Sequence, residues 1–256
     1  MGKNNFHQPS PNLYQFLPNK QLNNNKMPTL PSPFTLHPSP SACIFDLDGV
    51  LVDTAKYHYL AWKRLAEELG FYFSEADNER LKGVSRMASL DILLEVGGIT
   101  KLSAQDKLAM ADRKNSWYVE YISKMTPEEV LPGALDFLQQ VKAAGVKIAL
   151  GSASKNAGMI LQRTNIAPFF DVVIDGSKVS NAKPDPEIFL LGARELGVPP
   201  SECIVFEDAA AGIEAAIRAG MKCVGVGKPA ILHRATIVIP GFDGITWNKL
   251  MVQGKR

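Results

Sequence analysis

Short apolar runs alternate with longer segments of helical periodicity along most of the chain. The runs are rich in β-branched residues and nearly continuous, as expected of strands buried on both faces. They occupy residues 43–45, 146–150, 172–174, 204–206 and 223–226. Between them, the spacing of apolar positions predicts helices over residues 135–144, 157–164, 186–196 and 209–219. Strands that alternate with helices in this way predict an α/β fold with a doubly wound parallel sheet.

Residues that commonly cap or terminate helices lie at the ends of two of these helices. Asp185 can cap a helix that begins at Pro186, because proline suits the first helical position. Asp208 can cap the next helix, and Gly220 can end it. A last apolar run at residues 236–239 predicts a further strand at the edge of the sheet.

One long segment, residues 55–126, breaks the alternation because it contains no good strand. Its apolar positions form helical stripes, one made by Trp62, Leu65, Ala66 and Leu69, and another begun by Leu90, Leu93 and Leu94. We therefore predict an all-helical insertion after the first strand. An insertion at this point lies above the carboxyl ends of the strands, where open α/β sheets bind ligands, and it can close over a substrate.

The first forty residues differ in composition from the rest of the chain. They hold eight of the seventeen prolines, seven asparagines and three lysines, but no acidic residue. We interpret residues 1–40 as a disordered tail, with translation from Met27 as an alternative start. The remainder then divides into an α/β core, residues 41–54 and 128–256, and a helical cap, residues 55–127.

Composition narrows the classes of function. A net charge of +2 argues against nucleic acid or an anionic membrane as an obligate partner. No segment reaches the roughly 18 continuous apolar residues that a membrane span requires. The cysteines Cys43, Cys203 and Cys223 form no CxxC pair and lie at the edges of apolar runs, which is typical of buried thiols in a reducing compartment. We expect a cytoplasmic monomer that binds neither nucleic acid nor membrane.

The most informative motif follows the first apolar run directly and reads Asp46-Leu47-Asp48-Gly49-Val50-Leu51. Two carboxylates two positions apart share one side of an extended strand, and the glycine then allows a sharp turn. Such a pair predicts a site for a metal ion and a phosphate. A magnesium ion held there can shield an attacking carboxylate from an anionic phosphate.

Other strand ends carry groups that suit the same chemistry. The second strand leads into Gly151-Ser152-Ala153-Ser154-Lys155-Asn156, whose hydroxyls and free amides can bind a phosphate. Lys183 follows the third strand, and Glu207-Asp208 the fourth. Each could be structural when taken alone, as a turn residue, a solvated lysine or a helix cap. Together they meet at one sheet edge, where adjacent carboxylates repel unless a cation lies between them, and oxygen ligands favour Mg²⁺.

The ordered set DxDGV, Ser, Lys-Pro and Glu-Asp resembles the haloacid dehalogenase-like superfamily of phosphotransferases over residues 41–250, and the helical insertion resembles its smaller-cap branch. A narrower resemblance is to the β-phosphoglucomutase family. It rests on Asp53-Thr54, Tyr57-His58, Ala61-Trp62, Leu81-Lys82-Gly83-Val84-Ser85-Arg86, Arg113-Lys114-Asn115 and the Ser152–Asn156 segment. The cap run ending at Arg86 discriminates best, because general phosphatases of the superfamily share the core motifs but vary in the cap.

The resemblance implies a role for each candidate in the core. Asp46 would be the nucleophile and Asp48 the general acid/base, with Thr54 supporting the transition state. The cofactor Mg²⁺ would be bound by the Asp46 carboxylate, the Asp48 main-chain carbonyl, Glu207 and Asp208. The transferring phosphoryl group would be held by Ser152 and Lys183.

The resemblance also implies a second phosphate site and a sugar pocket. The distal phosphate would be held by Arg86, Ser154 and Asn156. The sugar pocket would be lined by His58, Trp62, Gly83, Val84, Ala153, Lys155 and Lys114.

The activity implied by the resemblance is the interconversion of β-D-glucose 1-phosphate and glucose 6-phosphate through an aspartyl-phosphate enzyme and β-glucose 1,6-bisphosphate. The alternative is a Mg²⁺-dependent sugar-phosphate phosphatase of the same superfamily, in which water attacks the phosphoenzyme. Only the mutase needs a second phosphate site, so Arg86 separates the two hypotheses. A non-catalytic binding protein is a third hypothesis, which the complete set of core motifs disfavours.

Overall fold

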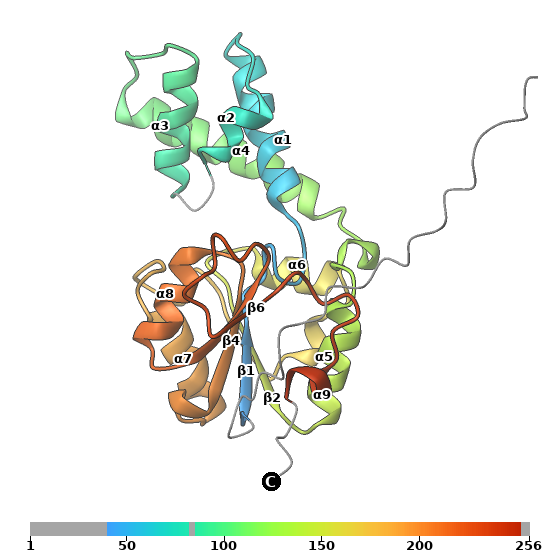
Figure 1. Cartoon of the computed structure of the whole chain (residues 1–256). Helices are drawn as coiled ribbons and strands as arrows, with labels where there is room; N and C mark the ends of the chain where they lie inside the picture. Colours follow the sequence, from blue (N-terminus) through green and yellow to red (C-terminus); the bar gives the residue numbers. More distant parts are fainter. Residues whose placement is uncertain (1–39, 82–84, 252–256) are drawn as a thin grey trace, which may run out of the picture. The chain divides into compact units, whose positions relative to one another are not determined.

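The computed structural model describes residues 40–81 and 85–251, which contain a six-stranded parallel sheet flanked by helices (Figure 1). The strands are β1 (Ala42–Phe45), β2 (Lys147–Gly151), β3 (Val172–Ile174), β4 (Cys203–Glu207), β5 (Lys222–Val226) and β6 (Ile237–Ile239). Their order is β3-β2-β1-β4-β5-β6, and every neighbouring pair is parallel. The predicted fold class and all six predicted strands are confirmed, with β3 and β6 at the two edges of the sheet.

The strand order reverses between β1 and β4, and this places the site. The chain passes from β1 outward to β3, then returns to β4 beside β1 and runs outward to β6. Loops that leave β1 and β4 therefore diverge and leave a crevice at the carboxyl ends of these two strands. Phe45 pairs in register with Phe206, so the residues that follow them emerge side by side.

Strand β1 is buried on both faces, which explains its continuous apolar sequence. Cys43 and Phe45 belong to one apolar cluster, and Ala42 and Ile44 to another. The first cluster is completed by α5 (Ala134–Ala143), α6 (Ala157–Arg163) and α9 (Trp247–Leu250), and the second by α7 (Glu187–Leu196) and α8 (Ala210–Arg218). Short 3₁₀ turns occupy Pro127–Glu129, Ala167–Phe169 and Pro200–Glu202. The sheet is thus the middle of three layers.

Of the three predicted helix ends, one is confirmed and two differ. Asp185 Oδ1 accepts the amide of Glu187 at 2.9 Å, but the N-cap of α7 is Pro186, which precedes the first helical residue, and α7 has no side-chain cap bond. Gly220 follows the end of α8 with φ +72°, as a terminating glycine should. Asp208 does not cap α8, whose N-cap is Ala209 without a side-chain bond. Asp208 contributes its carboxylate to an acidic cluster instead.

Between residues 55 and 126 the described part of the chain forms helices joined by loops and contains no strand, as predicted. It contains α1 (Ala55–Glu68), α2 (Glu75–Glu79), α3 (Arg86–Val96) and α4 (Ala104–Ile122). The predicted stripes, including Trp62, Leu65 and Leu90, meet in a third apolar cluster of their own. Within the described ranges no helix combines the length and the apolar character needed to cross a membrane.

The two segments that connect the helical insertion to the sheet are tied to each other. The Tyr57 hydroxyl donates to Glu129, and Lys56 Nζ lies 2.7 Å from Glu129 Oε2. The amide of Leu131 donates to the Leu51 carbonyl at 2.9 Å. The predicted tail lies outside the described residues except for Pro40, and the assignment of core and cap as separate domains stays a prediction.

Candidate active site

Three carboxylates gather at the carboxyl ends of β1 and β4. Asp46, Glu207 and Asp208 each offer an oxygen that lies within 4.8 Å of the other two. Asp46 is 7% exposed and Glu207 only 2%, so both are largely withdrawn from water. The β1–β4 register is the cause, because it sets the residue after Phe45 beside the residue after Phe206. This is the cluster that the sequence predicted at the sheet edge.

Lys183 supplies a positive charge to this cluster. Its ammonium donates to Asp46 Oδ1 and, at 2.8 Å, to Glu207 Oε2, and it lies 4.8 Å from the centre of the Phe189 ring. Desolvation lowers the pKa of Lys183, but the two carboxylates raise it and prevail, so the pKa stands above its ordinary value. Lys183 is therefore a fixed cation at neutral pH.

One lysine does not balance three acids, and the acids fit a divalent cation. Burial, and then the charge of Asp46, raise the pKa of Asp208; burial also raises that of Glu207, although Lys183 opposes the shift. Burial and the neighbouring carboxylates both disfavour the ionised cluster, and Lys183 offsets them only in part. Buried carboxylate oxygens are the donors that a hard divalent ion prefers. These carboxylate oxygens therefore suit a divalent ion. Without such an ion, the carboxylates can instead become neutral by taking up protons.

Two glycines make room for the acidic side chains. Gly49 has φ +76°, and a Cβ there would lie 2.0 Å from Asp208 Oδ2. A Cβ on Gly212, in the first turn of α8, would lie 2.0 Å from Glu207 Cδ. The sequence indicated a turn at Gly49 but not the role of Gly212, because Gly212 meets Glu207 only when α8 is packed on β4.

Asp48 turns away from the acidic cluster. Its Oδ1 accepts a hydrogen bond from the Thr54 hydroxyl, and Thr54 is itself buried. Burial raises the pKa of Asp48 to about 7; the charges of Asp46 and Asp208 add to the rise, and the Thr54 hydrogen bond opposes it. A carboxyl group with a pKa near neutrality can both give and take a proton.

The predicted phosphate-binding segment forms the turn between β2 and α6. Ser152 is 2% exposed, and its Oγ accepts the amide of Ser154 at 3.2 Å. The Oγ of Ser154 in turn accepts the amide of Asn156 at 3.2 Å. Ala153 and Lys155 are exposed between them. The hydroxyls are thus fixed by local backbone bonds.

A second group of predicted residues meets in the helical insertion. Lys114 is 3% exposed, with its Nζ 2.8 Å from His58 Nδ1 and 4.6 Å from the centre of the Trp62 ring. Desolvation, and then Arg86, lower the pKa of Lys114 to about 7. Desolvation and the charges of Lys114 and Arg86 also lower the pKa of His58, although this residue is exposed. These are basic groups that face one another with little acid between them.

Arg86 begins α3 and lies against α4. Its Nη2 donates to Asn115 Oδ1 at 2.8 Å, and its Nη1 is 3.9 Å from Asp112 Oδ1. Within the described ranges, its hydrogen bonds and ion pairs join it to neither Ser154 nor Asn156. The two halves of the predicted distal site are therefore separate here. The predicted residues Gly83 and Val84 lie outside the described residues.

Tyr118 contacts several of these candidate residues, and the sequence analysis missed it. It lies one turn after Lys114 on the buried face of α4, and its ring stacks on His58 with centres 4.0 Å apart. Its hydroxyl is 3.4 Å from Thr54 Oγ1. A tyrosine in an amphipathic helix is ordinarily a core residue, and only its spacing of four from Lys114 could have drawn attention to it.

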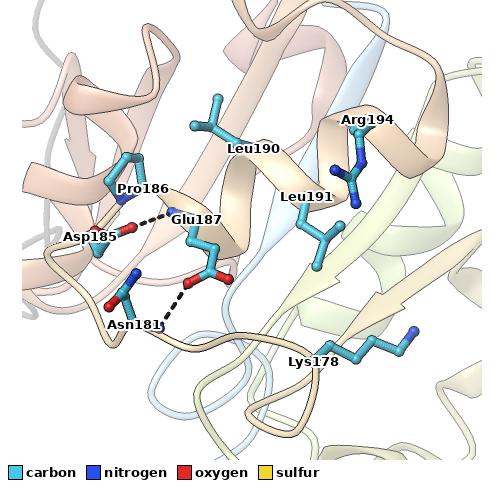
Figure 2. A pocket seen from close by; sticks show the side chains of 8 residues that line it. All are labelled: Lys178, Asn181, Asp185, Pro186, Glu187, Leu190, Leu191 and Arg194. Carbon is cyan, nitrogen blue, oxygen red and sulfur yellow. Dashed lines mark hydrogen bonds between the residues drawn. The ribbon is translucent and has the colours of Figure 1, made fainter.

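Two surface pockets are found in the described part of the chain, and one of them includes residues of the DxDGV motif. One, of about 340 Å³, is lined by Gly49 and Val50 of the DxDGV motif together with Leu131, Pro132, Val226, Gly227, Pro240, Gly241, Phe242 and Asp243. The other, of about 440 Å³, is lined by Lys178, Asn181, Asp185, Pro186, Glu187, Leu190, Leu191 and Arg194 (Figure 2). No predicted site residue lines the second pocket, although Lys183 lies in the loop between two of its residues.

Comparison with known proteins agrees with this geometry. The family described as haloacid dehalogenase-like hydrolase matches residues 40–220. A β-phosphoglucomutase of Bacillus subtilis is 47% identical over 206 residues, which are 80% of this chain and 91% of the relative. A phosphorylated carbohydrates phosphatase of Thermotoga maritima is 35% identical over 71% of this chain and 82% of the relative.

A solved structure shares the whole architecture. The crystal structure of a β-phosphoglucomutase from Clostridium difficile superposes with a TM-score of 0.74 and 45% identity, covering 82% of this chain and 94% of that one. The family match runs from β1 to the end of α8 and so includes the helical insertion. The chain therefore belongs to the haloacid dehalogenase-like hydrolase family, in the branch that contains the β-phosphoglucomutases.

Proposed function

We propose that this enzyme interconverts β-D-glucose 1-phosphate and glucose 6-phosphate, with β-glucose 1,6-bisphosphate as the intermediate. One observation carries the proposal: an acidic cluster at the sheet edge is accompanied by a cluster of basic residues, His58, Lys114 and Arg86, in the helical insertion. A mutase must hold two phosphates at once, and the second cluster offers the positive charge for the one that does not react. The relatives at 45% and 47% identity support the same activity.

In the proposed reaction Asp46 is the nucleophile. A carboxylate oxygen attacks the phosphorus, the bond from phosphorus to the sugar oxygen breaks, and an aspartyl phosphate forms. Lys183 contacts Asp46 directly, and with Ser152 it would neutralise the oxygens of the phosphoryl group in transit. Phosphoryl transfer depends chiefly on such positioning and charge neutralisation.

Asp48 would carry the proton in both half-reactions. It protonates the departing sugar oxygen and later takes the proton from the hydroxyl that attacks the phosphoenzyme. Its pKa of about 7 suits both directions. In the state described here its carboxylate is bonded to Thr54, so it must rotate before it reaches the substrate. Thr54 would then support the transition state from beside it.

The cofactor would be Mg²⁺, bound by the carboxylates of Asp46, Glu207 and Asp208 and by the main-chain carbonyl of Asp48. Three carboxylate oxygen donors, two of them on buried residues, and a shortage of positive charge support this choice. The chemistry it would supply is neutralisation of the charge between the nucleophile and the phosphate.

The distal phosphate would be held by Arg86, Ser154 and Asn156 once the helical insertion closes on the sheet. The planar guanidinium of Arg86 can bind two phosphate oxygens at once, which a lysine cannot. The sugar would lie among the remaining candidates, which are His58, Trp62, Gly83, Val84, Ala153, Lys155 and Lys114. The bisphosphate must turn within this space so that either phosphate can face Asp46.

A sugar-phosphate phosphatase is the second candidate. The Thermotoga maritima relative, 35% identical and named a phosphorylated carbohydrates phosphatase, favours it. Such an enzyme would use Asp46, Asp48, Ser152 and Lys183 alike and transfer the phosphoryl group to water. Its lower identity makes it the weaker alternative.

The cellular setting follows from the sequence and stays a prediction. The cysteines of the described ranges, Cys43, Cys203 and Cys223, are free and buried, as expected in a reducing compartment. We propose a cytoplasmic monomer that acts on a small sugar phosphate.

The direct test offers α- and β-glucose 1-phosphate separately, with a trace of glucose 1,6-bisphosphate and Mg²⁺. We expect glucose 6-phosphate from the β anomer at a rate at least about a hundredfold above that from the α anomer, because only one anomer aligns with both phosphate sites. A coupled dehydrogenase assay measures glucose 6-phosphate, and a colorimetric assay measures free phosphate. Free phosphate as the main product would establish the phosphatase alternative.

Arg86→Ala tests the second phosphate site. Loss of a bidentate charged contact should lower isomerisation of β-glucose 1-phosphate by about thirtyfold or more. Hydrolysis of acetyl phosphate, which carries no second phosphate, should change by less than about threefold. The matched control is Arg80→Ala, because Arg80 pairs with Glu95 on the surface of the same insertion. Equal losses of both activities in Arg86→Ala would count against two phosphate sites.

The acidic cluster predicts a pH dependence of stability. Asp48, Glu207 and Asp208 have raised pKa values, so between about pH 5 and 7 the folded protein keeps protons that the unfolded chain has lost. The free energy of unfolding of the metal-free protein should therefore fall as pH rises, by up to about 1.4 kcal/mol per pH unit for each such group. Saturating Mg²⁺ should flatten the fall, since it stabilises the ionised cluster.

Urea denaturation across this pH range, with and without Mg²⁺, measures the effect. Glu207→Gln should weaken the response to Mg²⁺, whereas Glu95→Gln, at an exposed surface pair, should preserve it. A metal-free protein whose stability does not change with pH would contradict the interpretation of the cluster.

A further inference from the structure

The loop that carries Lys183 contains neither a helix nor a strand. It runs from the end of β3 at Ile174 to the start of α7 at Glu187. The Lys183 side chain is nevertheless only 11% exposed, and its ammonium meets both Asp46 and Glu207. A side chain keeps such a position only when its backbone is fixed by other contacts, so the loop needs ties of its own.

Glu187, the first residue of α7, binds this loop through its carboxylate. Its Oε2 accepts the backbone amide of Asn181 at 2.8 Å, and both of its oxygens accept the amide of Ser180 at 3.1 Å. Figure 2 shows the bond between Glu187 and Asn181. The amide of Asn181, and then that of Ser180, lower the pKa of Glu187, so the carboxylate is ionised at neutral pH and these hydrogen bonds are charge-assisted.

The loop is also tied on the other side of Lys183. The amide of Asp185 donates to the Ala182 carbonyl at 3.0 Å, and Asp185 Oδ1 accepts the amide of Glu187 at 2.9 Å. Phe189, two residues further along α7, is buried, and its ring centre is 4.8 Å from Lys183 Nζ. The start of α7 therefore holds the chain before Lys183 through the Glu187 carboxylate and the chain after it through the Glu187 amide.

We propose that Glu187 is a positioning residue for phosphoryl transfer, which holds the loop so that the Lys183 ammonium faces Asp46 and the phosphoryl group. Within the described ranges, the hydrogen bonds of its carboxylate lead to the loop and not to the acidic cluster, so its effect must pass through Lys183. This inference rests on the proposed function. Its consequence is that every phosphoryl transfer to or from Asp46 depends on Glu187, because the same ammonium serves each of them.

Glu187→Gln tests the proposal, because it keeps the size of the side chain but replaces one accepting oxygen with an amino group. We expect kcat for isomerisation of β-glucose 1-phosphate to fall about tenfold or more, since small displacements of a catalytic group are costly. Hydrolysis of acetyl phosphate should fall by the same factor, unlike in Arg86→Ala. The KM for β-glucose 1-phosphate should change by less than about threefold, because the proposed distal phosphate site is intact.

A double variant separates positioning from a general loss of stability. Lys183→Ala leaves no ammonium to place, so adding Glu187→Gln should lower its residual acetyl phosphate hydrolysis, measured at raised enzyme concentration, by less than about twofold. Glu187→Asp keeps the charge and should recover part of the rate lost in Glu187→Gln. The matched control is Glu195→Gln, at an exposed position near the other end of α7, which should behave as the wild type.

Three results would overturn the positioning role of Glu187. They are wild-type rates in Glu187→Gln, a loss confined to isomerisation, and an equal loss with and without Lys183. Thermal unfolding shows whether each variant is folded at the assay temperature. If Glu187→Gln does not fold, Glu187→Asp alone and combined with Lys183→Ala gives the same comparison.

Failure of the inference is distinct from failure of the proposed function. A wild type that hydrolyses acetyl phosphate but forms no glucose 6-phosphate from the β anomer would overturn the mutase proposal, whereas the acetyl phosphate comparison would still decide the role of Glu187. A wild type with neither activity would overturn both.

Discussion

Mutual repulsion among Asp46, Glu207 and Asp208 is the constraint on which the rest of the structure depends. Three acids within 4.8 Å of one another, largely withdrawn from water, are unfavourable unless positive charge lies among them. The parallel register of β1 and β4 forces this proximity, and glycines at positions 49 and 212 leave the space for it. Lys183 neutralises part of this negative charge. The negative charge that remains makes the sheet edge a suitable site for a divalent cation and a phosphoryl group.

In the helical insertion the unfavourable interaction has the opposite sign, because basic groups lie close together there. Lys114 is buried with His58 Nδ1 as its nearest polar partner, and Arg86 lies close enough to lower its pKa further. An anion bound there would relieve the repulsion, just as a cation would relieve it at the sheet edge. A sugar that bears two phosphates could place one phosphate in each region, which gives a physical reason for one enzyme to carry both clusters.

The fold was predictable because its signals are local. Each inner strand is a buried β-branched run, and its bounds were predicted to within two residues. Gly220 ends α8 in a left-handed conformation that glycine favours, so the residue type alone indicates the helix end. Asp208 was assigned wrongly as a cap because a carboxylate at a strand end can serve either a helix amide or a cation. Only the neighbouring strand, with Asp46, decides between them.

The residues of the candidate site could be predicted from the sequence, but the contacts between them could not. The core acids, the serine turn and Lys183 follow from their places after strands, whereas the roles of the individual residues come from resemblance and await experiment. The pairing of Lys114 with His58 joins residues 56 positions apart, and the hydrogen bond from Tyr118 to Thr54 joins residues 64 positions apart. Neither periodicity nor a motif records such contacts, so they required the three-dimensional structure.

The central claim is that Asp46 accepts a phosphoryl group, and chemical trapping measures it directly. The enzyme is incubated with β-glucose 1,6-bisphosphate and Mg²⁺, quenched, and treated with borohydride, which converts an aspartyl phosphate to homoserine for identification by peptide mass spectrometry. We expect the conversion at Asp46 alone, dependent on Mg²⁺ and absent from Asp46→Asn. Homoserine at another position, or none under turnover conditions, would contradict the account.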